Sequence, residues 1–256
     1  MTTLWDMVAA ELLKLRKRRG LFWWSVVLVV GSVIVIEVAV QIVHIFDSSD
    51  HGPAGGTPNF AGTMSGLSAF SGLTAVLIGT TAGSGDVTAG VFRDLVSTGR
   101  SRLALFAVRL PGAVLMFVPL LVIAYLIAVA VCYGLAGNQA TPSAGLAVHF
   151  GLWLLAGRFF DLCLAVGFAA LIGARGIAIG VLLAWQLAVG PILASITFFG
   201  VFREMVPAAA SDRLRPVVDN NTHLTPMSIA AALIVLAVWA AALLAAGAWR
   251  TATVDA

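Results

Sequence analysis

Apolar residues are gathered into six long runs that short polar connectors separate. The hydrocarbon core of a bilayer is about 30 Å thick, and an α-helix needs about 20 apolar residues to cross it. The pattern therefore predicts an all-α membrane protein whose single domain covers residues 1–256. The six predicted transmembrane helices cover residues 21–46, 60–81, 103–134, 145–173, 177–199 and 227–249.

The composition supports this interpretation and excludes a soluble protein. Hydrophobic residues make up 60% of the chain and charged residues only 11%, whereas a soluble domain carries about 25% charged residues. The net charge of +3 is too small to indicate a nucleic-acid-binding protein. Cys132 and Cys163 both stand in apolar runs, so we expect no disulfide.

The positions of the basic residues predict the orientation of the chain. Loops on the cytoplasmic side of a membrane protein are rich in Lys and Arg. Eleven of the fifteen basic residues lie on the same side of the membrane as the two termini, next to the ends of the spans. Three lie on the other side, in the loop 200–226. We therefore expect both termini in the cytoplasm, at the plasma membrane of a bacterium.

Residues 1–20, before the first span, form a predicted amphipathic helix. Leu4, Trp5, Val8, Leu12 and Leu15 fall on one arc of a helical projection, and the charged residues Asp6, Lys14, Arg16 and Lys17 fall opposite. Such a helix is typical of a segment that lies in the inner headgroup layer, with its basic end at the anionic lipid surface.

The connector between the second and third spans is longer and more patterned than a simple turn. Asp86 can cap a short helix, apolar residues recur three to five positions apart after it, and Gly99 can end it. We therefore predict a short helix on the cytoplasmic side.

This connector resembles that of the ABC-2 type permeases, the membrane subunits of ATP-driven exporters. The matching positions are Asp86, Gly90, Phe92, Arg93, Leu95, Ser101 and Arg102, and the N-terminal segment 11–19 is similar to the opening helix of that family. The resemblance implies a homo- or heterodimer of six-helix subunits with two cytoplasmic ATPases. In it the connector would be a coupling helix, with Val91, Phe92 and Leu95 touching the ATPase while Arg93 and Arg102 meet acidic groups.

The chain contains no Gly-x-x-x-x-Gly-Lys-[Ser/Thr] sequence, the loop that cradles the phosphates of ATP in such ATPases. We therefore expect no catalytic residue and no cofactor in this chain. ATP and Mg²⁺ would bind to the partner ATPase. A structural or regulatory membrane subunit and, less well supported, an intramembrane enzyme are the alternatives.

Three charged residues lie inside predicted spans, where a charge costs about 2.5–3.5 kcal/mol on insertion scales. Glu37, Arg158 and Asp161 are placed at depths that allow one cluster, either as a clamp between helices or as a substrate or proton site. In the resembled family the second and fifth spans border the substrate route. This makes Ser65, Ser68 and Thr74 of the second span candidates for that route.

The four histidines, His44, His51, His149 and His223, lack the close spacing of metal ligands, so we expect no metal site. The apolar interior favours lipids, amphiphilic drugs or peptides over small ions as cargo.

Overall fold

The computed structural model describes residues 4–48, 52–97, 99–218 and 226–253, and within these ranges the chain forms helices and no strands. Six helical stretches are long and apolar enough to cross a membrane, so the prediction of an all-helical chain with six candidate spans is confirmed. They are Arg19–Phe46, Thr57–Thr88, Arg102–Gly134, Ala144–Ile172, Arg175–Ser195 and Ile229–Thr253.

The first half of the chain contains three of these stretches. Its elements are α1 (Leu4–Lys17), α2 (Arg19–Val26), the π-helical turn η1 (Val27–Gly31), α3 (Ser32–Phe46), α4 (Thr57–Thr88), α5 (Phe92–Ser97), α6 (Arg102–Ala107) and α7 (Arg109–Gly134). The second half contains α8 (Ala144–Ile172), α9 (Arg175–Ala184), the π-helical turn η2 (Trp185–Val189), α10 (Gly190–Ser195), the 3-10 helix η3 (Thr197–Met205), α11 (Pro207–Arg213) and α12 (Ile229–Thr253).

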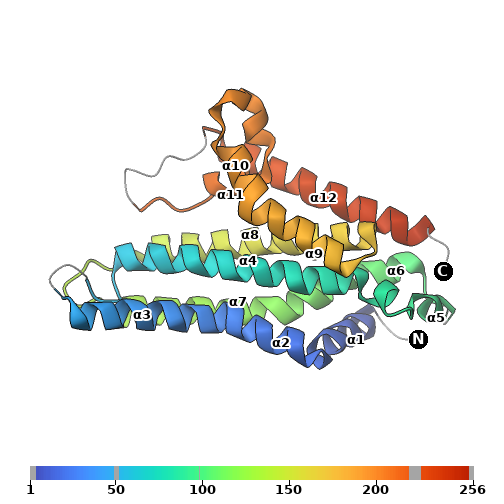
Figure 1. Cartoon of the computed structure of the whole chain (residues 1–256), viewed down its shortest axis with the longest axis horizontal. Helices are drawn as coiled ribbons and strands as arrows, with labels where there is room; N and C mark the ends of the chain where they lie inside the picture. The colour runs from blue at the N-terminus through green and yellow to red at the C-terminus, as the bar shows by residue number, and fades with distance from the viewer. Residues whose placement is uncertain (1–3, 49–51, 98, 219–225, 254–256) are drawn as a thin grey trace.

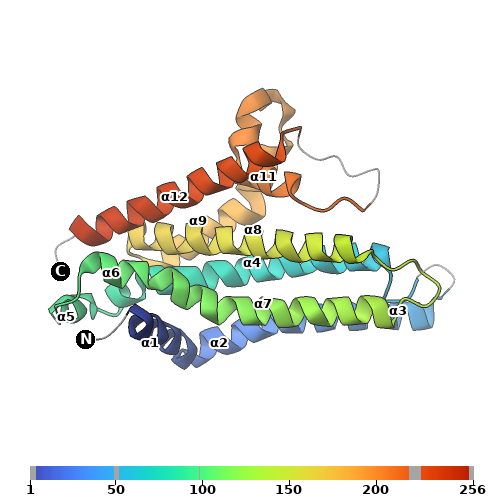
Figure 2. The same cartoon turned by 180° about the vertical axis from the view of Figure 1, so that it is seen from behind.

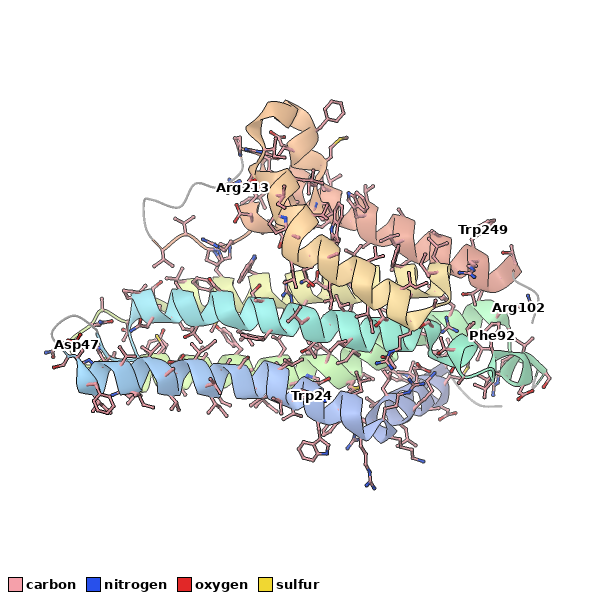
Figure 3. All side chains as sticks on the ribbon, viewed as in Figure 1. Trp24, Asp47, Phe92, Arg102, Arg213 and Trp249 are labelled. Carbon is pink, nitrogen blue, oxygen red and sulfur yellow. The ribbon has the colours of Figure 1, made fainter. Side chains whose placement is uncertain are left out.

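Four helices, α3, α4, α7 and α8, run side by side along the long axis of the molecule (Figures 1 and 2). Both chain ends, α5 and α6 lie at one end of this bundle, which we call the terminal end. Asp47 lies at the opposite end (Figure 3). Helix α12 packs along α8, and α10, η3 and α11 stand over the middle of the bundle.

Small residues allow the central helices to pack closely. A β-carbon added at Gly83 of α4 would lie 2.5 Å from the Val166 carbonyl oxygen of α8, and one at Gly167 of α8 would lie 2.5 Å from the Leu243 backbone of α12. Such distances leave no room for a side chain. Nearer the start of α4, Gly66 faces Ile36 closely, whereas Gly62 has open space beside it.

The second and fifth spans end at residues other than those that the sequence predicts. Helix α4 continues to Thr88 instead of ending near residue 81, because its small and polar last turns are buried against neighbouring helices. The fifth span ends at Ser195 instead of near residue 199, because the backbone of Ile196 is extended, with φ −76° and ψ 104°.

Candidate functional site

Four charged side chains meet at the terminal end of the bundle, and we call them the terminal charge cluster. They are Glu11 and Lys14 of α1, Asp86 of α4 and Arg109 of α7. The Lys14 Nζ lies 2.5 Å from Glu11 Oε2 and 2.8 Å from Asp86 Oδ1, and the Arg109 guanidinium lies 3.7 Å from Asp86 Oδ2. Two acids and two bases therefore balance each other in one contact that joins three helices.

Arg109 is the most deeply placed member of the terminal charge cluster, with a side chain that is 1% exposed. Its guanidinium donates a hydrogen bond to the Gly83 carbonyl oxygen at 2.8 Å. It also stacks over the rings of Phe92 and Phe106, at 5.9 and 5.8 Å from their centres. Because Phe92 begins α5, this contact fixes the start of α5 against the bundle.

Glu11 is held close to α7 by a glycine. A β-carbon at Gly112 would lie 2.7 Å from the Glu11 Cγ, so only glycine lets α1 lie directly on α7 here. Burial raises the pKa of the Glu11 carboxyl above its ordinary value of 4.5, and the neighbouring Lys14 opposes that shift. One Glu11 oxygen is buried without a hydrogen-bond partner. α1 therefore carries a buried acid on the face that the hydrophobic pattern assigns to apolar contacts.

The connector between the second and third spans differs in detail from the prediction. Asp86 does not cap a separate helix: it lies inside α4, and α5 begins only at Phe92, after Gly90 turns the chain with a φ of 71°. Phe92 is buried beside Arg109 in the single chain, and its predicted contact with an ATPase stays a prediction. Val91 is exposed and Leu95 is half-buried.

The two arginines of the predicted coupling segment are placed as follows. Arg93 is in α5, and its side chain lies outside the described part of the structure. Arg102 begins α6 and donates a hydrogen bond to the Ala252 carbonyl oxygen of α12 at 3.2 Å. Ser101 caps α6 by accepting a hydrogen bond from the Ala104 amide.

The predicted intramembrane cluster is formed by only two of its three residues. Arg158 and Asp161 of α8 form an ion pair at 3.1 Å, and Arg158 also donates to the Ser68 carbonyl oxygen of α4. Glu37 does not join them, because its carboxyl lies beside Thr63 at another part of the α3–α4 contact. The depths of Glu37 and Arg158 along their helices are compatible with a meeting, but α3 packs chiefly against α4 and α7, away from Arg158 on α8.

A cavity of about 330 Å³ lies between α4, α8, η2 and α11, and the Arg158–Asp161 pair lines it. Ser65 and Ser68, two of the predicted route residues, also line it. Thr74 does not: it is buried and donates to the Phe70 carbonyl oxygen within its own helix. The cavity is thus next to the polar face of the second span.

Four polar residues of this cavity, Ser211 among them, were not singled out from the sequence. Gln186 of η2 donates a hydrogen bond to Asp161 Oδ2 at 3.4 Å. Asp212 and Arg215 come from α11 and the turn after it. Burial raises the pKa of the Asp212 carboxyl, and Arg215 opposes this shift. A single glutamine in an apolar run was the only sequence signal for Gln186.

Within the described ranges, no group of three or more His, Cys, Asp and Glu residues is arranged to hold a metal ion. His51 and His223 lie outside these ranges. Comparison of the sequence with models of known protein families, and with curated proteins, finds no match in either case.

Proposed function

We propose that the chain is an ABC-2 type permease, the membrane subunit of an ATP-driven exporter in the bacterial plasma membrane. It would pair with a second permease subunit, identical or different, and the termini would lie in the cytoplasm. Separate ATPase subunits would bind ATP and Mg²⁺. The sequence supports this division, because it lacks the phosphate-binding loop that ATP hydrolysis requires.

One observation carries the proposal: the connector between the second and third spans is tied to the N-terminal helix and projects from the terminal end. The terminal charge cluster joins the last turns of α4 to α1, and Phe92 joins the start of α5 to Arg109 of α7. An ATPase that moved α5 would therefore move α1, α4 and α7 with it. This is the linkage that energy transfer from a cytoplasmic subunit needs.

The exposed apolar side chains of this connector offer a docking surface. Val87 is 48% exposed and Val91 is 42% exposed, on either side of the turn at Gly90. Isolated apolar residues on a protein surface are common, but two beside a rigid charged anchor suit a contact with a protein partner. Phe92, which is buried, would position the helix.

The proposal is tested by changing Val91 to Asp and co-expressing the chain with the ATPase encoded beside it. A charge at the centre of a protein contact should remove co-purification of the ATPase while the abundance of the permease stays unchanged. Val217→Asp is the matched control, because Val217 is 46% exposed but lies after α11, far along the chain from the connector. Capture of the ATPase by the Val91→Asp variant at the level of the unchanged protein would contradict this assignment.

A further inference from the structure

The cavity between α4, α8, η2 and α11 has the size and the mixed lining of a small-molecule site. Its volume of about 330 Å³ lies within the range of about 300–1,000 Å³ for such sites. One part of the wall is aromatic, with Trp153, Phe160 and Trp185. Another part is polar, with the Arg158–Asp161 pair and Gln186.

Both positive charges of the cavity already face a carboxyl group. Arg158 is engaged by Asp161 and by the Ser68 carbonyl oxygen. Arg215 lies close enough to Asp212 to stabilise its carboxylate. An anionic ligand would therefore have to separate an existing ion pair, which makes an anion a poor fit.

Two buried polar atoms of this cavity have no hydrogen-bond partner: the Arg158 Nε, whose charge Asp161 balances, and the Gln186 carbonyl oxygen. The Gln186 amide nitrogen faces Asp161 and donates to its Oδ2. This fixes the orientation of the amide and leaves the Gln186 carbonyl oxygen buried and unpaired. A buried acceptor without a donor costs about 1–3 kcal/mol. A ligand that brings N–H groups would remove that cost.

We propose that this cavity binds an amphipathic amine. The ammonium group donates hydrogen bonds to the Gln186 carbonyl oxygen and the Asp161 carboxylate, and the apolar body packs against the aromatic wall. The faces of tryptophan rings attract cations, so Trp153 and Trp185 favour the same charge. The role of this amine as exported cargo rests on the proposed function, whereas its binding in the cavity does not.

The test measures binding to the purified chain in lipid nanodiscs. The probe is dodecane-1,12-diamine with a fluorescent dansyl group on one nitrogen and a free ammonium group on the other. Its N-acetylated form, which has no charge, is the comparison ligand, and empty nanodiscs give the background from partition into lipid. We expect saturable binding of the amine and at least tenfold weaker binding of the acetylated form.

Two variants locate the site, and one serves as a control. Gln186→Leu removes the unpaired acceptor and should weaken amine binding about tenfold, the usual effect of losing a hydrogen bond to a charged group. Ala69→Phe, at an exposed position of the cavity wall, fills the space and should abolish saturable binding. Gln139→Leu removes another buried, unpaired glutamine oxygen, outside this cavity, and should change nothing.

The possible results separate clearly. The proposal is wrong if the unchanged chain shows no saturable binding, if the acetylated probe binds as tightly as the amine, or if Gln186→Leu binds with unchanged affinity. If Gln186→Leu does not fold, Ala69→Phe and the acetylated probe still decide. None of these measurements involves an ATPase, so the amine site can fail while the capture of the ATPase by the connector succeeds, and the reverse.

Discussion

Replacement of Arg109 by Met tests whether charge balance holds the terminal end together. The change keeps most of the apolar stem but removes the guanidinium, and with it the hydrogen bond to Gly83 and the pairing with Asp86. Removal of one partner from a buried ion pair costs about 3–5 kcal/mol. For a chain of this size that corresponds to a fall in Tm of roughly 6–20 °C. Thermal unfolding of the detergent-purified protein, followed by size-exclusion chromatography, measures this fall.

The magnitude follows from what the variant leaves behind. Arg109→Met leaves Glu11 and Asp86 with Lys14 as their one close cation in the terminal charge cluster, so one negative charge stays buried and unbalanced. The double variant Arg109→Met/Glu11→Gln restores the balance, because Asp86 and Lys14 remain as a pair. We expect the double variant to recover a substantial part of the lost stability. Arg19→Met, at an exposed position, is the control and should change stability by about 0.5 kcal/mol or less.

Dependence on pH adds a second signature to the same variant. The pKa of Glu11 is raised by burial, so the folded protein binds the proton of this carboxyl more tightly than the unfolded chain does, whose value is near 4.5. Protonation of Glu11 therefore adds to the free energy of unfolding. This contribution is fully present below about pH 4.5 and is lost as the pH rises through the raised pKa of Glu11. The stability gap between Arg109→Met and the unchanged protein should therefore narrow as the pH falls through that range, and Arg109→Met/Glu11→Gln should not show the narrowing. A double variant as unstable as the single one, with a gap that does not change with pH, would refute charge balance as the explanation.

Two further predictions concern the membrane-spanning helices. Arg158→Leu should reduce the yield of folded protein, measured as the folded fraction after purification. A second change, Asp161→Asn, should restore that yield and Glu37→Gln should not, because only Asp161 pairs with Arg158. Equal rescue by both second changes would show that Glu37 does meet the arginine. Gly83→Val should destabilise the contact of α4 with α8 by about 1–3 kcal/mol, since its β-carbon would lie 2.5 Å from the Val166 carbonyl oxygen, whereas Gly62→Val has open space and should be neutral in the same thermal assay.

The sequence predicts the number and approximate limits of the spans because hydropathy depends on composition within one segment. It fails where packing between segments decides the structure. The last turns of α4 consist of small and polar residues that read as a loop, and they become helical because Arg109, Lys14 and α8 surround them. In the same way, the burial of Phe92 depends on a cation from a helix that follows it.

The candidate sites show the same division. The pairing of Arg158 with Asp161 is predictable, since residues three apart share a helical face. The separation of Glu37 from this pair depends on the packing of α3 against α4 and α7 instead of α8, which one sequence does not specify. Gln186 joins the cavity because η2 directs it toward α8, and no local pattern marks it as more than a polar residue in a span.

The π-helical turn Val27–Gly31 sets the rotational phase of the whole outer half of the first span. Such a turn amounts to one residue inserted into an α-helix, and each residue of an α-helix advances the face by about 100°. Excision of a single residue from this turn would restore a continuous α-helix and leave α3 in its present phase, whereas conversion of the turn to α-helix with all residues kept would rotate α3 by about that angle. Glu37 would then leave its place beside Thr63 and swing toward the bilayer. The first span should therefore accept the loss of one residue at this turn more readily than a substitution that removes the π-helical hydrogen bonds and keeps the length.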